Sequence, residues 1–363
     1  METFDLLQTL CETPGPSGFE ADIAAVIQEI WRPLVDDITV DAMGSVIARK
    51  KGVGGAAAGQ EKRPSILLAA HMDEIGLMVR HVLEFKGNGF LRVDRIGGVD
   101  ARHLYGQQVV VHGRKNLRGI IGAPQTSLLA ADRKFKPYDF DTLVVDTGTP
   151  YETLREIVSV GDAVTFYQPL RKLKNGRVAG KSIDNRCSLV TVTQCLEALQ
   201  TRQHEWDVVA VATVQEEVGL KGAATSAFSQ RPDIGIAIDV TFGSGPGAND
   251  ERTFKVGGGP AISYMPDSHP AVSKGLADAA AAMEMGVQSE YAAAGGGTDA
   301  YALQIAREGI PTSGIGIPLR YMHTMVESIS LKDLQRVGRL LTEYICQLDN
   351  KTIDALAKSM MDD

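Results

Sequence analysis

The sequence predicts an α/β protein in which helices cover a mixed sheet and a small β-barrel domain is inserted into the chain. Residues 1–74 and 167–363 combine helical periodicity with apolar runs of strand length. Residues 75–166 instead carry short β-rich runs separated by Gly, Asn and Asp. We therefore expect one discontinuous domain, 1–74 with 167–363, and one inserted domain, 75–166. A chain of 363 residues with 44% hydrophobic side chains is long and apolar enough for both.

The N-terminal segment predicts two helices and then two strands. Leu6, Leu7 and Leu10 share a helical face over residues 3–12, and the Pro-Gly-Pro run that follows ends this helix. The stretch SGFE, residues 17–20, has the pattern of a capping box and predicts the start of a second helix. The runs DITVDAMGSVIARK and PSILLAAH predict paired strands, joined by the Gly/Ala-rich surface loop KGVGGAAAGQEKR.

The inserted segment predicts a small barrel. Its β-rich runs are GLMVRHV, GFLRVDRI, QQVVVHG, LRGIIGA, TLVVDTG and DAVTFYQ. Short strands at regular spacing are typical of such a barrel. A helical turn is expected near PYETLREIV. Residues 125–140 have no clean period and carry basic side chains, so we expect a flexible loop there.

The α/β pattern returns after residue 166. We expect a helix after Asp184, buried strands at WDVVAVATVQ and DIGIAIDV, and a helix over residues 270–285. Ser330 and Asp333 have the spacing of a second capping box. This box is expected to begin a long final helix over LKDLQRVGRLLTEYICQLD.

Composition narrows the function classes. A formal charge of −8 argues against nucleic acid and anionic membranes as partners. No run approaches 18 apolar residues, and METFDLLQTLCETPG lacks the features of a signal peptide. The cysteines Cys11, Cys187, Cys195 and Cys346 form no C-x-x-C pair, which favours reduced thiols in a cytoplasmic protein. Cys187, three residues after Asp184, either fills the core or approaches a metal site.

Side chains that bind metals well stand where the strand-like runs end. They are His71, Asp184, Glu216, Glu217, Asp239 and His323. Such positions suit a crevice at the carboxyl ends of a sheet, where open α/β folds bind their ligands. Imidazole nitrogen together with carboxylate oxygen suits zinc or a similar divalent ion. The set therefore predicts a metalloenzyme.

Each of these residues also has a plain structural interpretation. If the strand continues through His71 and Asp73, both point the same way, which suits a metal-binding His oriented by a carboxylate; otherwise they are a strand-end His and a solvated Asp. An isolated Asp such as Asp184 is more often a helix N-cap than a ligand. Glu216 and Glu217 point apart in extended backbone, so one can bind metal while the other is a general base. Alternatively, both are exposed in a loop.

Two further segments complete the candidate site. Asp239 ends a buried strand with no Lys or Arg near it in sequence, so it needs a cation or a cap. His323 lies in a polar loop and indicates little alone. The loop GGGTDA permits close backbone approach, so it either lines a substrate pocket or forms a simple turn. Its candidates for substrate binding are Gly296, Gly297, Thr298 and Asp299.

The candidate ligands can balance two divalent ions. Such ions bring four positive charges, Asp184, Glu217 and Asp239 bring three negative charges, and a bridging hydroxide brings the fourth. Without the ions, carboxylates in one pocket repel one another and their pKa values rise. We therefore expect metal to bind tightly and to stabilise the fold.

Taken in order, the motifs HMDEIG, DNR, EEVG, the strand-end Asp239, GTDA and YMHT resemble those of the tetrahedral (TET-type) dinuclear metallo-aminopeptidases. That family includes glutamyl, leucyl and deblocking aminopeptidases, and some members carry the name cellulase M or endoglucanase. The resemblance covers nearly the whole chain and implies a sheet of the zinc-exopeptidase type. It also implies that the insertion is a dimerisation domain and that subunits form a hollow homododecamer.

The resemblance assigns roles to residues of this chain. It implies one ion held by His71, Asp184 and Asp239, and a second held by Asp184, Glu217 and His323. It further implies that Glu216 is the general base and that Asp73 orients His71. Cys187-Ser188, Gln125-Thr126-Ser127 and the GSGPG loop depart from the family pattern and leave substrate preference open.

The activity implied is removal of N-terminal residues from short peptides. Two zinc or cobalt ions would lie about 3.5–4 Å apart, bridged by Asp184 and by a hydroxide that Glu216 helps to form. The alternatives are a metal-dependent hydrolase of a non-peptide amide, a non-catalytic metal-stabilised assembly, and a glycosidase. A glycosidase needs two carboxyl groups and no metal, and the chain has only two Trp for sugar stacking. The preferred N-terminal residue and the native metal, manganese included, stay open.

Overall fold

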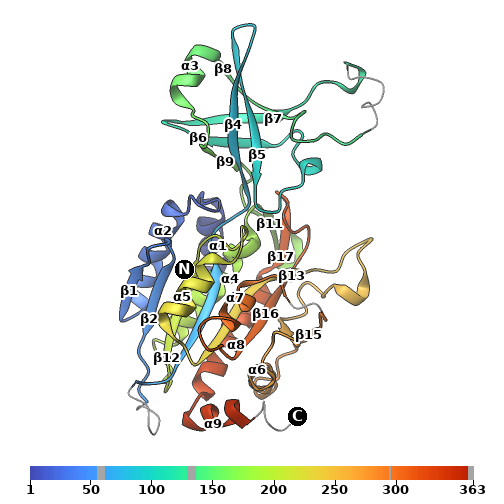
Figure 1. The fold of residues 1–363 in the computed structure, drawn as a ribbon. Helices are drawn as coiled ribbons and strands as arrows, with labels where there is room; N and C mark the ends of the chain where they lie inside the picture. Colours follow the sequence, from blue (N-terminus) through green and yellow to red (C-terminus); the bar gives the residue numbers. More distant parts are fainter. Residues whose placement is uncertain (55–61, 129–135, 294–295, 359–363) are drawn as a thin grey trace.

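The fold is known from a computed structural model that describes residues 1–54, 62–128, 136–293 and 296–358. Figure 1 shows an α/β part with a β-barrel standing above it. The predicted fold class, a helix-covered mixed sheet with an inserted barrel, is confirmed. Among the described residues, no helix is both long and apolar enough to cross a membrane.

The α/β part is built on an eight-stranded mixed sheet. In spatial order its strands are β1 (Asp37–Val40), β2 (Val46–Lys50), β12 (Asp207–Thr213), β3 (Ser65–His71), β13 (Ile234–Phe242), β16 (Thr312–Leu319), β14 (Ala261–Ser263) and β15 (Gln288–Glu290). The central strands β12, β3, β13 and β16 are mutually parallel. Their carboxyl ends therefore meet at one edge of the sheet, where such folds bind ligands.

One predicted strand pairing is wrong. β2 and β3 are separated by β12, which is antiparallel to β2 and parallel to β3. Every residue of β12 after Asp207 is buried, so this strand needs a neighbour on each side and helices on both faces. That requirement outweighs the short connection between β2 and β3. Part of that connection, 55–61, lies outside the described residues.

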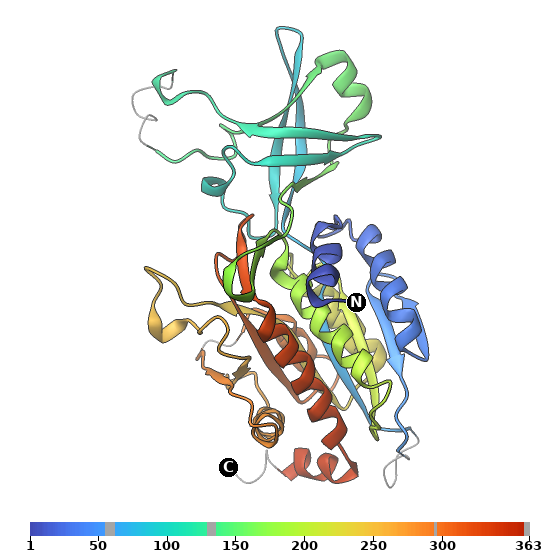
Figure 2. The ribbon, with the colours of Figure 1, turned by 180° about the vertical axis from the view of Figure 1, so that it is seen from behind.

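Helices cover both faces of the sheet. One face carries α1 (Thr3–Glu12), α2 (Ala21–Trp31), α4 (Ile183–Ala198), α6 (Pro270–Ala282), α8 (Leu331–Gln347) and α9 (Asn350–Lys358). The view from behind shows α1, α4 and α8 together on this side (Figure 2). The other face carries α5 (Lys221–Gln230) and α7 (Asp299–Gln304). Along β3, Ile66 and Leu68 join the first core, whereas Leu67 and Ala69 join the second.

Neither predicted capping box forms. α2 begins at Ala21, and the hydroxyl of Ser17 donates instead to the carboxylate of Asp73. α8 begins after Ser330, but Asp333 accepts the backbone N–H groups of Gly257 and Gly259. In both cases a contact distant in sequence replaces the local one that the S-x-x-E/D pattern predicts.

The barrel is closed and has a core of its own. Its strands, in spatial order, are β4 (Gly76–Phe85), β5 (Asn88–Ile96), β8 (Val144–Pro150), β7 (Asn116–Gly122), β6 (Gln108–His112) and β9 (Ala163–Phe166). The helical turn near PYETLREIV is α3 (Tyr151–Ile157). The predicted loop over 125–140 lies partly outside the described residues, which omit 129–135.

A small three-stranded sheet lies where the barrel meets the α/β part (Figure 1). Its strands are β10 (Arg171–Lys172), β11 (Arg177–Gly180) and β17 (Glu327–Ser330). β11 leads directly into the start of α4, and β17 pairs with it from Arg177 to Gly180. The pairing brings Glu327 beside the segment that carries Asp184.

Candidate metal centre and substrate pocket

A cavity of about 520 Å³ opens at the carboxyl edge of the central sheet. β3 ends at His71, and Asp239 lies near the end of β13, so parallel pairing brings both to this edge. The lining residues that sequence analysis named as metal ligands or general base are His71, Asp184, Glu216, Glu217, Asp239 and His323. The fold thus gathers residues spread over more than 250 positions of sequence.

Asp184 lies between the two histidines. Its Oδ1 is 3.2 Å from His71 Nε2, and its Oδ2 is 3.3 Å from His323 Nε2. Asp239 Oδ1 lies 3.7 Å from His71 Nε2, and Glu217 Oε1 lies 3.2 Å from His323 Nε2. Each histidine therefore faces Asp184 and a further carboxylate, Asp239 for His71 and Glu217 for His323. This is the arrangement of two adjoining ligand sets with a common bridging carboxylate.

These spacings fit metal ligation. Two ligand atoms, each about 2.0–2.2 Å from one tetrahedral zinc ion, lie about 3.3–3.6 Å apart. The four nitrogen-to-oxygen distances span 3.2 to 3.7 Å. The donors are imidazole nitrogens and carboxylate oxygens, which suit zinc and its first-row neighbours. The residues present therefore fit two ions.

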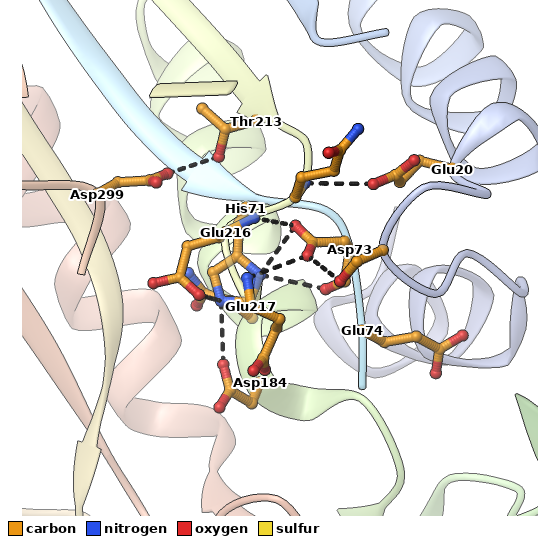
Figure 3. Close-up of polar contacts among 12 residues, drawn as sticks. Glu20, His71, Asp73, Glu74, Asp184, Thr213, Glu216, Glu217 and Asp299 are labelled. Carbon is orange, nitrogen blue, oxygen red and sulfur yellow. Dashed lines mark hydrogen bonds and ion pairs between the residues drawn. The ribbon is translucent and has the colours of Figure 1, made fainter. Parts of the chain in front are cut away.

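Asp73 holds the site together through several contacts (Figure 3). β3 ends at His71, so the strand does not continue through Asp73. The backbone carbonyl of Asp73 lies 3.1 Å from His71 Nδ1, and its carboxylate oxygen Oδ1 lies 3.6 Å from that atom. The same carboxylate accepts the backbone N–H groups of Glu216 and Glu217 and the hydroxyl of Ser17. Asp73 thus fixes the position of the two glutamates as well as facing His71.

Glu216 and Glu217 face different partners. Glu217 faces His323, whereas Glu216 Oε2 lies 3.9 Å from His71 Nε2. The chain leaves β12 after Thr213, and Gln215 adopts a left-handed conformation with φ of 55°. The extended backbone assumed from sequence is therefore absent at this point, although the carboxylates still diverge. Glu216 also groups with His71 and Asp239 as a possible ligand set, so its role needs a direct test.

Glu327 is a site residue that the sequence analysis missed. It is buried, and its two oxygens accept the backbone N–H groups of Asp184, at 3.0 Å, and of His323, at 2.9 Å. His323 adopts a left-handed conformation with φ of 58°, which a non-glycine residue holds only with support from its surroundings. The available signal was an acidic residue in the short strand-like stretch VESISL, which alternates apolar and polar side chains around Ile329.

A buried ionic network lies behind the cluster. Glu74 points away from the ligand cluster in Figure 3 and lies 2.6 Å from Lys181 Nζ. It also accepts the hydroxyl of Ser182 and lies 4.0 Å from Arg186. These partners flank Asp184 in sequence, so the network anchors the start of α4. Glu74 lies in the motif HMDEIG, but the sequence pattern predicts no role for it.

Too many carboxylates gather here for the cationic side chains present. Burial raises the pKa of Glu216 to about 10, and the charge of Asp239 adds to this effect although His71 opposes it. Burial likewise raises the pKa of Asp239 well above its usual value. Burial also raises the pKa of Glu217. Divalent ions would relieve the repulsion among these groups.

The pKa values of the two histidines are raised, whereas the pKa of Asp184 is lowered. Burial alone would lower the pKa of His71, but Glu216 and Asp184 raise it overall well above its usual value. Hydrogen bonds to Asp184 and Glu217 raise the pKa of His323 to about 11. Burial opposes ionisation of Asp184, yet both histidines lower its pKa. The site thus favours positive charge at the two places where ions would bind.

The GGGTDA loop lines the cavity only in part. Gly296, Gly297 and Thr298 line it, whereas Asp299 is buried and accepts the hydroxyl of Thr213 (Figure 3). Gly295 lies outside the described residues. The cavity continues past the metal ligands to Asp267 and Glu290, which the sequence analysis did not single out.

Cys187 lies in the core behind the site. It is fully buried on α4 and belongs to none of the possible metal-ligand groups among the described residues. All four cysteines are free, as predicted. Of the two interpretations of Cys187, the structure therefore favours the core filler.

Comparison with known proteins gives a consistent family. The family model described as M42 glutamyl aminopeptidase matches residues 44–340. A putative aminopeptidase of Acetivibrio thermocellus is 36% identical, covering 95% of this chain and 99% of that protein. A lysyl aminopeptidase of Pyrococcus furiosus is 34% identical, covering 96% of this chain and 98% of that protein.

Solved structures agree with these matches. A TET aminopeptidase from a Thaumarchaeota archaeon superposes with a TM-score of 0.90 at 32% identity, covering 98% of this chain and 99% of that one. The Pyrococcus horikoshii TET1 peptidase superposes with a TM-score of 0.82 at 30% identity, covering 96% of this chain and 100% of that one. It is described as assembling into a tetrahedron or a large octahedral shell.

Proposed function

The chain belongs to the M42 glutamyl aminopeptidase family, whose members hydrolyse peptide bonds, and we propose that it removes N-terminal residues from short peptides in a reaction that depends on two metal ions. One observation carries the metal-dependent part. Asp184 presents one carboxylate oxygen to each of two histidines, and each histidine has a further carboxylate beside it. A bridging carboxylate between two nitrogen-and-oxygen sets is what a dinuclear site requires.

His71, Asp184 and Asp239 would hold one ion, and Asp184, Glu217 and His323 would hold the other. The donor set suits zinc or cobalt and also admits manganese. When bound, the ions would supply an activated water and a Lewis acid for the scissile carbonyl. Asp73 would orient His71 through its ring Nδ1, the usual task of a carboxylate or carbonyl behind a metal-binding His.

Glu216 would act as the general base. Its carboxylate lines the cavity beside His71 and belongs to neither ligand set that Asp184 bridges. It would take a proton from the attacking water and return it to the leaving amine, a contribution of about 10²–10⁴ in rate. Asp73 would keep it in place by accepting its backbone N–H.

Two alternatives share parts of this site. A hydrolase of a non-peptide amide would use the same ions and base and would differ in the pocket. A glycosidase would need two carboxyl groups free to flank a sugar, whereas the carboxylates here pair with histidines. Both tryptophans, Trp31 and Trp206, are fully buried in the core, so neither can stack on a sugar.

We further propose the arrangement of the whole enzyme. Residues 1–74 and 167–363 would form the catalytic domain, and residues 75–166 would form a dimerisation domain. The similar TET1 peptidase is described as assembling into a tetrahedron or a large octahedral shell, which supports a homo-oligomer, and we propose a homododecamer built from dimers. A cytoplasmic location fits the free cysteines. Light scattering that finds a monomer at every concentration would contradict the assembly.

Hydrolysis of one short peptide in two forms tests the activity. The peptide with a free N-terminus should be shortened from that end, and its N-acetylated form should not. Chelation should abolish cleavage, and added zinc or cobalt should restore it. Equal cleavage of both forms, internal cleavage, or activity unaffected by removal of the ions would overturn the proposal.

A further inference from the structure

The floor of the cavity beyond the metal ligands is formed by two glycines, which have no side chains. Gly314 and Gly316 lie on β16, and Gly316 is directly opposite Asp239 in the register of the sheet. A Cβ at Gly316 would lie 2.8 Å from Thr241 Cγ2 and 2.9 Å from Glu290 Oε2. A Cβ at Gly314 would lie 2.6 Å from Ser263 Oγ. The glycines therefore let the side chains of Thr241, Ser263 and Glu290 lie directly against β16, and any larger residue would displace them.

Glu290 reaches across this floor toward the candidate metal centre. It lies on the edge strand β15, opposite Ser263 of β14, yet its carboxylate accepts the hydroxyl of Thr241 on β13. That contact spans the two intervening strands, β14 and β16. Thr241 is two residues beyond Asp239 on the same strand and face, a step of about 7 Å. The Glu290 carboxylate thus lies about one long side chain away from the proposed metal ligands.

Within the described part of the chain, no Lys or Arg forms an ion pair with Glu290. The Glu290 side chain is half-buried, and this burial raises the pKa of its carboxyl. The hydroxyl of Thr241 donates a hydrogen bond to the carboxylate. No Lys or Arg occurs among the described residues that line the cavity. A desolvated carboxylate is costly unless a positive charge reaches it. The described lining residues leave that charge to be supplied by a ligand.

The other charged side chains that line the cavity are also mostly acidic. Its acidic lining residues are Asp184, Glu216, Glu217, Asp239, Asp267 and Glu290. Four of them surround the proposed ions, which leaves Asp267 and Glu290 uncompensated. Asp267 accepts the backbone N–H of Gly296 and so holds the glycine loop at the rim of the same space.

From these contacts we infer that the pocket selects a cationic N-terminal residue, lysine or arginine, whose side chain pairs with Glu290. The inference rests on the proposed function, because it takes the space beside the metal ligands to be the site of the first substrate residue. A four-carbon lysine stem matches the step from Asp239 to Thr241. An acidic side chain would meet Glu290 with like charge, and an apolar one would leave it buried without a partner.

Rates on a panel of Lys, Arg, Leu, Ala and Glu anilides test the inference with the zinc- or cobalt-loaded protein. The wild type should prefer Lys and Arg. Glu290→Gln should lower the ratio of kcat/KM for Lys over that for Leu by about 10- to 100-fold, the usual worth of a charge-assisted hydrogen bond. Glu290→Arg should shift the preference toward Glu. The exposed Glu284→Gln, outside the cavity lining, is the matched control and should leave the ratio unchanged.

The outcomes separate this inference from the proposed function. A wild type that prefers Leu, Ala or Glu, or a Lys-over-Leu ratio unchanged in Glu290→Gln, overturns the basic pocket while leaving the aminopeptidase intact. Absence of activity on every anilide and peptide, in protein that binds two ions, overturns the proposed function itself. Thermal unfolding of each variant shows whether a changed ratio comes from a folded protein.

Discussion

Glu216 and Glu217 are adjacent in sequence, yet their carboxylates face different histidines. The proposed mechanism makes Glu217 a ligand and Glu216 the base. We therefore predict that Glu216→Gln lowers kcat by about 10²–10⁴ while the protein keeps two ions per subunit. Steady-state kinetics and elemental analysis of the same sample measure both quantities.

The exposed Glu156→Gln on α3 is the control for this variant and should match the wild type. Two results would count against the assignment. One is a Glu216→Gln variant of nearly full activity. The other is loss of one ion, which would make Glu216 a ligand, as its grouping with His71 and Asp239 also allows.

Glu327 supports both halves of the site without facing the proposed ions. Its oxygens accept backbone N–H groups from Asp184 and His323. We predict that Glu327→Ala weakens metal affinity by about 10- to 100-fold, as is usual when a partner behind a ligand is lost. Competition with a chromophoric chelator measures this affinity. Glu327→Gln retains one acceptor oxygen, so its metal affinity should lie between those of the wild type and of Glu327→Ala. Equal metal affinity in all three proteins would show that Glu327 does not position the ligands.

At this scale the sequence indicated the ligand cluster and Asp73, but not the supporting residues Ser17 and Glu327. His71 and Asp239 could be proposed because each lies at or near the end of an apolar strand of the central sheet, whereas Asp184 begins α4 and could be proposed through its motif DNR. Ser17 could not, because its S-x-x-E context matched a helix cap better than a contact with Asp73, 56 positions away. Glu290 offered even less signal, since its role depends on reaching over two strands whose order the sequence does not reveal.

Among the elements, the loop after β5 links the barrel to the candidate metal centre. A Cβ at Gly98 would lie 2.4 Å from His323 Nδ1, and one at Gly97 would lie 3.2 Å from Glu217 Cβ. We predict that Gly98→Ala displaces His323 and weakens binding of the second ion by about 10- to 100-fold. Ion content after dialysis at graded free metal concentrations measures this change.

Gly122→Ala in β7 is the matched control, because a Cβ there meets nothing within 4 Å and its φ is not positive. It should bind both ions as the wild type does. Wild-type metal affinity in Gly98→Ala would show that the barrel loop does not restrain His323.

Element types were more predictable than element neighbours. The helix over residues 3–12 and the six barrel runs follow from periodicity and turn residues, which are local properties. The pairing of β2 with β12 was not predictable in the same way. It depends on where a fully apolar strand finds two neighbours, and that is decided by the whole sheet.

For the whole molecule, the crowded carboxylates link metal binding to stability. Ions that bind the folded state and relieve repulsion must stabilise it, by about 2.7 kcal/mol for each ion present at 100 times its Kd. We predict that chelation lowers Tm and that zinc or cobalt restores it in proportion to the logarithm of free metal. Scanning calorimetry at one protein concentration measures this shift.

Asp184→Asn, which weakens the bridge, should show a smaller response to metal than the wild type. An unchanged wild-type Tm after complete removal of the ions would contradict the link between charge and stability. The fold class and the family were thus readable from sequence, whereas the connection between barrel, support residues and pocket needed the three-dimensional arrangement.

Anomalous diffraction from crystals grown with zinc tests most directly whether two ions share Asp184 and leave Glu216 free. We predict two peaks about 3.5–4 Å apart. One should contact His71, Asp184 and Asp239, and the other Asp184, Glu217 and His323. A single peak, or a peak coordinated by Glu216, would contradict the proposed dinuclear site and its base.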